Sequence, residues 1–440
     1  MGRSDIRFMP APKVELKSWW DRLGNDGQSY VESRLGRLVP LLDIDVQSGV
    51  MQALAHFWCP QTSTFIFGKH ELTPTLEEYS IAIGKPLELE LISPPLGLEP
   101  ESILSDFLRM DKNQIKRVFK DNCHACPFSF LDQSFVNADT LLKSKIFLLA
   151  FFGFIVFPLR KGAINPSVTW VVKQVCAGIS FVNTILAETF LSLTRFKENE
   201  DKTFRAPIEL LQIWFFSHMS RIDIRMKIIN LTDSHHPIEV FKNHQDRTPN
   251  LSFSKWVKLL KNPNTKIFLW HAKWFQVSKA CLSHGDNEPI PLLGITGATS
   301  YYPLRVARQY RVVQDLPPPL KLGLFQVRFS AKDDDHKKQL RYIEQAWLAC
   351  HEQKLSLPED ELEGKEKIYY ATALYIRQHK IPTKFLPKVP DVTEKPTRQA
   401  ELNRHKRKIE ELEKQAKKDA KEKRQLRRAL ASRLFIDRAK

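Results

Sequence analysis

The stretch Leu72–Pro86, LTPTLEEYSIAIGKP, carries both the start and the stop signals of a helix. Thr73 is suited to cap the N-terminus, and Pro74 fits the first helical position. The acidic pair 77–78 then falls in the first turn, where the helix dipole favours negative charge. Gly84, with a proline two residues beyond it, ends the helix. The segment therefore predicts a short helix with defined ends.

The same helical period extends through most of the chain. Apolar residues between 46 and 57 recur every three to four positions, which predicts one apolar helix face. Further helices are predicted at 102–120, 139–158, 167–195, 207–219, 252–260, 337–353 and 366–380. Short strands are predicted near 64–67, 266–270 and 325–329. The expected fold is mainly α: a large helical domain with a few short strands, followed by a long basic C-terminal helix or weak coiled coil.

Composition changes divide the chain into four parts. The predicted parts are an N-terminal lead-in at 1–37, a helical domain at 38–380, a linker with four prolines at 381–396, and a basic helical tail at 397–440. A heptad frame over the tail places apolar residues at six of ten core positions. This is a weak seam. A single charged helix, a short self-associating dimer and a coiled coil all remain open.

Positive charge is concentrated at the C-terminal end. The whole chain carries a net charge of +17, and residues 394–440 contribute 17 Lys and Arg against 8 Asp and Glu. Such a segment favours polyanions, nucleic acid first and anionic membranes second. The longest apolar run, 146–159, has 14 residues and is too short to span a bilayer as a helix. We therefore expect a soluble intracellular protein with no membrane partner.

Metal, cofactor and catalytic signatures are weak. Cys123 and Cys126 have the spacing of a zinc knuckle, but no second half-site follows, so ordinary free thiols are favoured. The loop 294–300 could offer backbone N–H groups to a phosphate, yet it lacks the ending of a P-loop, and a tight turn leading into a helix is the better interpretation. We expect no cofactor and find no catalytic constellation.

One segment of the body combines arginines with aromatic residues. Arg305, Arg308, Tyr310 and Arg311 are the candidates for contact with nucleic acid, because arginine binds phosphate and an aromatic ring stacks on a base. The alternative is that these arginines pair with acidic residues of the body while the tyrosines cover the core.

The tail carries basic clusters of the kind that serve as nuclear-import signals. The candidate residues are Arg404, Lys406, Arg407, Lys408, Lys423, Arg424, Arg427 and Arg428. A solvated helix stabilised by ion pairs four residues apart would carry the same pattern. The expected location is the nucleus, and otherwise the cytoplasm.

Three landmarks in a fixed order resemble a known plant family. They are ALAHFW at 53–58 leading to LTPTLEEY at 72–79, LLQIW at 210–214 ending at His218, and YPLRVARQY at 302–310 followed by three prolines. Over roughly 38–385 they look like the plant mobile domain and its uncharacterised relatives. Relatives usually carry glycine where Arg311 stands here.

The resemblance implies a mainly helical domain found in plant transposable elements and in host genes derived from them, some of which act in the nucleus. It supplies no catalytic residues, and the sequence does not support the aminotransferase label that some members carry. The leading hypothesis is a non-enzymatic, nuclear, transposon-associated protein that binds protein or nucleic acid. An unrecognised enzyme acting on nucleic acid, or a scaffold assembling through the tail, are the alternatives.

Overall fold

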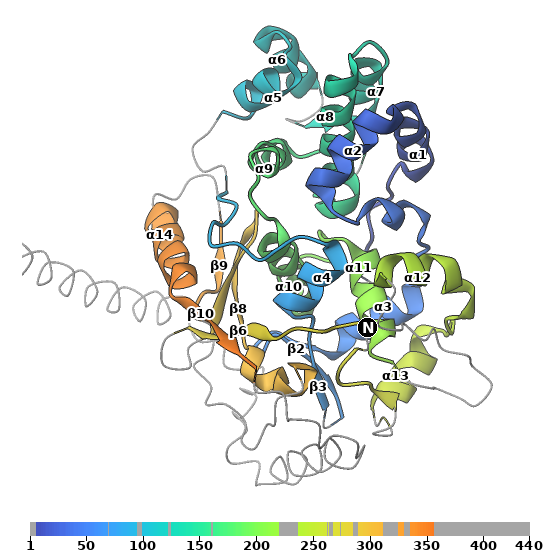
Figure 1. Ribbon diagram of the computed structural model, residues 1–440, viewed down its shortest axis with the longest axis vertical. Helices are drawn as coiled ribbons and strands as arrows, with labels where there is room; N and C mark the ends of the chain where they lie inside the picture. Colours follow the sequence, from blue (N-terminus) through green and yellow to red (C-terminus); the bar gives the residue numbers. More distant parts are fainter. Residues whose placement is uncertain are drawn as a thin grey trace, which may run out of the picture. The chain divides into compact units, whose positions relative to one another are not determined.

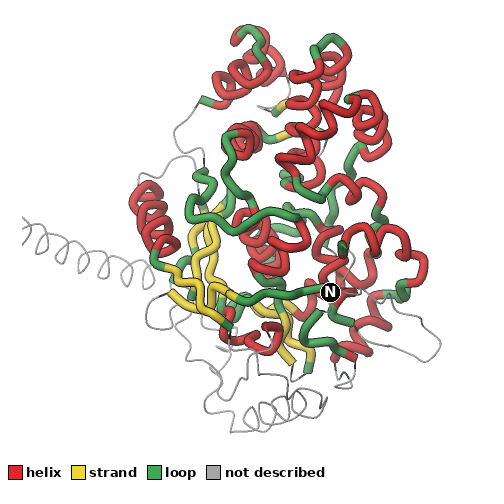
Figure 2. Tube along the Cα trace, in the orientation of Figure 1, coloured by secondary structure: helices red, strands yellow, loops and turns green. Residues whose placement is uncertain are grey.

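The computed structural model describes most of the chain up to residue 355. The described residues are 6–68, 70–94, 99–121, 125–159, 162–219, 236–261, 263, 267–272, 274–284, 289–310, 324–329 and 335–355. They belong to one unit, Met1–Gln378, and the remaining residues, His379–Lys440, form a second unit outside the described part. The first unit is mainly α-helical with short strands (Figures 1 and 2), which confirms the mainly α part of the predicted fold class. The predicted linker and tail lie outside the described residues.

Helices make up most of the first unit. The helices are α1 (Lys13–Arg22), α2 (Gly24–Leu35), α3 (Ser48–Phe57), α4 (Leu76–Ile83), α5 (Pro100–Leu108), α6 (Lys112–Asp121), α7 (Phe128–Val136), α8 (Thr140–Phe151), α9 (Pro166–Cys176), α10 (Val182–Lys197), α11 (Ile208–Ser217), α12 (Pro237–His244), α13 (Phe253–Lys261) and α14 (Asp335–Leu348). Shorter turns are η1 (Val39–Asp43), η2 (Phe152–Val156), η3 (Gln245–Arg247) and η5 (Pro303–Tyr310).

Helix α4 confirms the prediction from residues 72–86 but begins later than expected. The capping residue is Thr75, not Thr73: its hydroxyl accepts from the Glu78 N–H at 3.1 Å, and the Glu78 carboxylate accepts from the Thr75 N–H at 3.0 Å. This reciprocal capping box requires a Thr and a Glu three residues apart. Gly84 closes the helix with a left-handed backbone at φ 73°.

Two long predicted helices are broken in the structure. The predicted helix 102–120 is divided into α5 and α6 because Arg109 adopts a left-handed backbone at φ 55°. The predicted helix 167–195 is divided into α9 and α10, with Gly178 at φ 105° between them. The apolar run 146–159 lies in α8 and η2 and is buried, in agreement with the prediction of a core helix.

Helix α10 lies at the centre of the unit. Every residue from Val182 to Arg195 is buried. The helix contacts α3, α4, β1 (Trp58–Cys59), β7 (Ile290–Leu293) and β8 (Gly297–Tyr301), as Figure 1 shows. A helix surrounded on all sides has no solvated face, so its polar residues must find partners inside the protein.

The strands form small antiparallel sheets. The remaining strands are β2 (Thr64–Phe67), β3 (His70–Leu72), β4 (Cys126–Pro127), β5 (Ala163–Ile164), β6 (Lys279–His284), β9 (Val327–Arg328) and β10 (Cys350–Lys354). The sheet orders are β1-β2-β3, β7-β8-β9, β6-β10 and β4-β5. Strand β2 has the predicted bounds, and β9 lies within the predicted 325–329.

Three other local predictions, one of a strand, one of a helix and one of a turn, are wrong. Of the predicted strand 266–270, the described residues 267–270 contribute an isolated bridge from Phe268 to Met219. Residues 350–353, predicted as helix, lie in β10, where they pair with β6. Residues 297–300, predicted as a turn into a helix, lie in β8 between β7 and β9. Pairing across the sheet outweighs the local signals at these positions.

The N-terminal residues are part of the helical unit rather than a separate lead-in. Helices α1 and α2 both contact α8. Trp19, on α1, is buried and stacks between Phe128 and Phe135 at centroid distances of 5.0 and 4.4 Å. Its indole N–H donates to the Asp132 carboxylate at 3.1 Å. The buried side chain of Trp19 therefore packs this otherwise polar segment against the core.

Candidate functional site

The predicted nucleic-acid cluster folds inward. Its described residues, Arg305, Arg308 and Tyr310, lie on η5, which follows β8 directly. The backbone of η5 is kinked at Val306, between the two arginines, and each arginine has a different partner. All three side chains are buried. The fourth candidate, Arg311, lies outside the described residues.

Arg305 is held by an acidic residue of the body. Its guanidinium donates twice to the Glu71 carboxylate on β3: Nε lies 2.7 Å from Oε2, and a terminal nitrogen contacts Oε1. Both side chains are more than nine-tenths buried. A planar guanidinium fits a carboxylate in this two-pronged arrangement, which makes a strong, directional pair. The pair joins η5 to β3.

Arg308 and Tyr310 also contact residues of the core. The Arg308 guanidinium lies 3.7 Å from the centre of the Trp270 ring, a cation–π contact. The Tyr310 hydroxyl donates to the Glu77 carboxylate at 2.6 Å and lies 2.9 Å from the Tyr301 hydroxyl. These contacts favour the alternative interpretation, in which the arginines and tyrosines of this segment serve the core.

The acidic pair at the start of α4 forms the centre of a buried polar network. The Glu78 carboxylate accepts from the Trp214 indole N–H at 2.9 Å and lies 2.8 Å from Nε2 of His218. The amide of Gln309 donates to the same carboxylate at 3.2 Å and to the Thr73 carbonyl at 2.9 Å. One carboxylate thereby connects α4, α11 and η5.

The environment of Glu78 keeps it ionised. The second ring nitrogen of His218 lies 2.8 Å from the Leu269 carbonyl oxygen, so both ring nitrogens face acceptor atoms. Burial alone would raise the pKa of Glu78, but the charge and hydrogen bond of His218 hold this pKa below its usual value. The ionised carboxylate of Glu78 is therefore enclosed in the core among its hydrogen-bond partners.

Glu77 has the opposite tendency. Burial, opposed by hydrogen bonds from Tyr310 and the Cys281 N–H, raises the pKa of Glu77 from 4.5 to about 7. The nearby charge of Glu78 acts in the same direction as burial. Two adjacent glutamates therefore differ in protonation because only one of them faces a cation.

This difference predicts a pH-dependent stability. Because folding raises the pKa of Glu77, its contribution is complete below pH 4.5 and is lost as the pH rises through 7. Between pH 4.5 and 7, we expect the ionisation of Glu77 to lower the free energy of unfolding by on the order of 3 kcal/mol. In Glu77→Gln this loss should disappear, since the amide keeps an acceptor for Cys281 and a polar contact to Tyr310.

Urea unfolding at pH 5, 6, 7 and 8 measures this effect. The free energies of the original protein and of Glu77→Gln should converge at low pH and separate at high pH. Parallel pH profiles for the two proteins would show that Glu77 does not titrate in this window.

The glycine loop at 294–297 already holds an internal anion. The N–H of Thr296 donates to the Glu188 carboxylate at 2.7 Å, and its hydroxyl donates to the same group at 2.8 Å. A Cβ at Gly294 would lie 2.5 Å from that carboxylate, so only glycine fits there. The backbone N–H of this loop that could have served a phosphate is thus used by Glu188 of α10.

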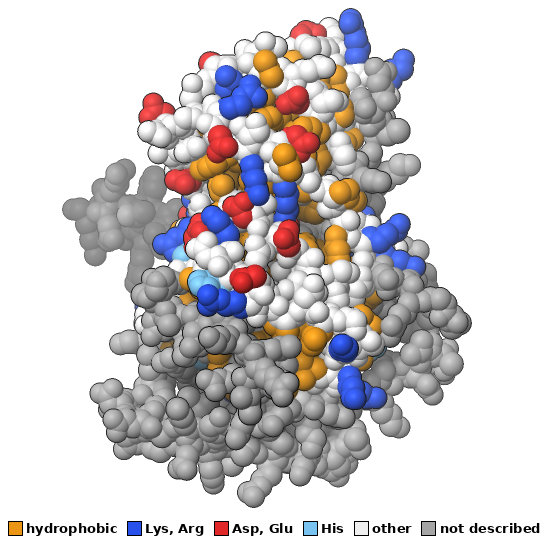
Figure 3. All heavy atoms as spheres, turned by 90° about the vertical axis from the view of Figure 1, so that its right-hand side faces the viewer, with side chains coloured by type: hydrophobic (Ala, Val, Ile, Leu, Met, Phe, Trp, Pro, Cys, Tyr) orange, Lys and Arg blue, Asp and Glu red, His pale blue; other side chains and the backbone are white. Residues whose placement is uncertain are grey.

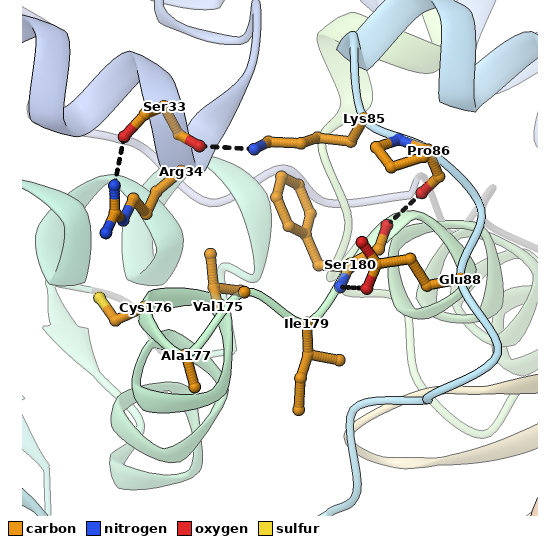
Figure 4. A pocket seen from close by; sticks show the side chains of 12 residues that line it. Ser33, Arg34, Lys85, Pro86, Glu88, Val175, Cys176, Ala177, Ile179 and Ser180 are labelled. Carbon is orange, nitrogen blue, oxygen red and sulfur yellow. Dashed lines mark hydrogen bonds between the residues drawn. The ribbon is translucent and has the colours of Figure 1, made fainter.

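A separate cavity lies between α2, the segment after α4 and the α9–α10 junction (Figure 4). Its volume is about 310 Å³. The lining residues are Ser33, Arg34, Lys85, Pro86, Glu88, Val175, Cys176, Ala177, Gly178, Ile179, Ser180 and Phe181. No feature of the sequence pointed to this cavity, because its three walls come from segments far apart in the chain.

A comparison with known families identifies the body of the chain. The model of a family described as a domain of unknown function, DUF7745, matches residues 16–372. The chain belongs to this family. No curated protein and no solved structure matches the chain. The match makes no link to the plant mobile domain, and that resemblance stays a prediction.

The remaining predicted sites lie partly or wholly outside the described residues. Cys123 and all eight import candidates fall there. Cys126 is buried, and burial raises the pKa of its thiol to about 12, which disfavours the thiolate that zinc requires. Within the described ranges, no group of three or more His, Cys, Asp or Glu side chains could hold a metal ion. None of the helices described here is long and apolar enough to cross a membrane.

Proposed function

We propose that this chain is a non-enzymatic binding protein that holds nucleic acid through its basic C-terminal segment, residues 394–440. The uneven charge supports this proposal: these 47 residues have 17 Lys and Arg against 8 Asp and Glu. A dense positive segment attracts the phosphate backbone and gains free energy by releasing condensed counterions.

The burial of two arginines in the body favours the tail, rather than the body, as the part that contacts nucleic acid. Arg305 and Arg308, the two described arginines of the predicted cluster, are buried, and their guanidinium groups face Glu71 and Trp270. On the face drawn in Figure 3, basic, acidic and hydrophobic side chains are interspersed. Such a mixture provides weaker attraction for a polyanion than a segment of one dominant sign.

Neutralising the tail should weaken binding in a salt-dependent manner. We expect the full chain to bind a labelled DNA duplex at 50 mM salt and to lose affinity as salt rises. Replacing Arg404, Lys406, Arg407 and Lys408 by glutamine should reduce the slope of log affinity against log salt by up to about 4. Fluorescence anisotropy over a salt series measures both quantities.

A matched variant of the body serves as the control. Lys116 on α6 and Lys255, Lys258 and Lys261 on α13 are exposed, and changing these four to glutamine removes the same charge. This variant should retain the original slope. The proposal would be rejected if the body variant lost more of the salt slope than the tail variant, or if the unaltered chain did not bind DNA at 50 mM salt.

We extend the proposal to the nucleus, where the import clusters of the tail would direct the protein. A fluorescent fusion of the tail variant, with Lys423, Arg424, Arg427 and Arg428 also neutralised, provides the second readout of the same prediction. Nuclear accumulation unchanged from the original fusion would exclude the import role. The association with transposable elements remains a proposal that rests on the sequence resemblance.

A further inference from the structure

Two cations line the cavity described above from different walls, Arg34 from α2 and Lys85 from the segment after α4. The Lys85 ammonium donates to the backbone carbonyl of Ser33 at 2.6 Å, and the Arg34 guanidinium donates to the hydroxyl of the same residue (Figure 4). Arg34 also lies 4.4 Å from the centre of the Tyr30 ring. Ser33 therefore brings both positive groups to the edge of the same hollow.

These cations lack an acidic partner of their own. Among the described residues, neither Arg34 nor Lys85 forms an ion pair with a carboxylate. An ammonium has three N–H donors and a guanidinium has five, so each retains donors after its contact with Ser33. Glu88, also lining the cavity, accepts instead from the Ser180 N–H at 3.3 Å.

The electrostatics of Lys85 favour an anion at this position. Burial and then the charge of Arg34 lower the pKa of Lys85, while Glu88 opposes them. A negative group placed between the two cations would reverse the effect of Arg34 and favour the charged ammonium. The same group would accept hydrogen bonds from both side chains.

The rest of the lining suits a short apolar body. Val175 and Phe181 are enclosed behind the lining, with exposed fractions of 4% and 0%, whereas Ile179 is partly exposed. A volume of about 310 Å³ falls at the small end of ligand sites. It has room for one ring and an attached anionic group.

We propose that this cavity binds a small organic anion, a carboxylate or a phosphate monoester, whose charged group lies between Arg34 and Lys85 and whose apolar body rests on Ile179. The site is distinct from the tail, because it recognises one compact charged group beside an apolar surface rather than a charged polymer.

Calorimetric titration of the full chain tests the proposal with three probes of similar size. Phenyl phosphate and benzoate carry the anion, and benzamide is the neutral counterpart. We expect dissociation constants on the order of 0.1–1 mM for at least one anion and at least tenfold weaker binding of benzamide. The relative affinity of phenyl phosphate and benzoate decides between a phosphate and a carboxylate ligand.

Substitutions separate the cavity from the basic tail. Arg34→Met and Lys85→Met should each weaken binding of the anion about tenfold or more, because each removes one charged hydrogen bond. Lys85→Arg, which keeps the charge, should retain most of the affinity. Lys258→Met, a change of the same kind at an exposed position of α13, should leave the affinity unaltered. Thermal unfolding confirms that each variant is folded.

Alkylation of cysteines locates the bound probe. Cys176 lines the cavity and is partly exposed, whereas Cys59, also partly exposed, lies on β1. The bound anion should slow the labelling of Cys176 by N-ethylmaleimide and leave the labelling rate of Cys59 unchanged. Mass spectrometry measures the labelled fraction of each cysteine over time. No binding of either anion, affinity unchanged in both methionine variants at the cavity, or equal protection of the two cysteines would overturn the proposal.

Discussion

Replacing Glu78 by alanine is expected to lower the free energy of unfolding by about 3–5 kcal/mol. The change removes an acceptor that serves Trp214, Gln309 and the ring of His218 in the core. It also removes half of the capping box with Thr75 that begins α4. Each buried donor left without a partner adds a desolvation cost.

Glutamine at the same position separates charge from hydrogen bonding. In Glu78→Gln the amide oxygen can accept from Trp214 and the amide nitrogen remains beside the His218 ring, so the contacts are kept while the negative charge is lost. We therefore expect a cost of about 1–2 kcal/mol, well below that of alanine. Guanidinium unfolding of both variants measures the difference. Equal costs would show that packing volume, rather than the hydrogen-bond network, sets the effect.

The second large effect is expected at Arg305. Arg305→Met should cost about 3–5 kcal/mol because it leaves the carboxylate of Glu71 buried without its cation. Methionine keeps the length and apolar stem of arginine, so the loss reports mainly on the charge. The free energy of unfolding of Arg305→Lys should lie between those of the original protein and Arg305→Met. Lysine keeps the charge, but an ammonium cannot make the two-pronged contact.

A double variant provides the matched control. Combining Arg305→Met with Glu71→Met removes both charges, and most of the lost stability should return. Denaturant unfolding of the two single variants and the double variant completes the cycle. Additive losses would mean that the pair is not coupled, and that the cost of Arg305→Met arises elsewhere on η5.

The three sequence landmarks meet in the structure. The first provides Glu77 and Glu78, and Glu71 directly precedes its second segment. The second provides Trp214 and His218, and the third provides Arg305, Gln309 and Tyr310. Residues separated by more than 130 positions therefore share one buried polar network. A polar group in the core constrains its partners more strictly than an apolar group does, because each donor needs an acceptor. This requirement gives the landmarks a structural role.

The candidate site was predicted only in part. The sequence singled out Arg305, Arg308 and Tyr310 as unusual and left two interpretations, contact with nucleic acid and pairing within the body. The side chains face Glu71, Trp270 and Glu77, as the second interpretation expects. Charge and aromatic content describe what a side chain can bind and do not describe which partner the fold supplies. The signal that could have located the partners is the set of acidic residues at 71, 77 and 78.

The sequence by itself determined the mainly α character, helix α4 with its glycine stop, the buried run at 146–159 and the concentration of charge after residue 394. These are local properties, set by periodicity, capping residues and composition over short windows. Only the tertiary structure decided which polar residues are enclosed, which glutamate titrates near neutral pH, and where Arg34 and Lys85 meet across a cavity. Burial and long-range pairing depend on chain segments hundreds of residues apart, and neither can be read from a local pattern.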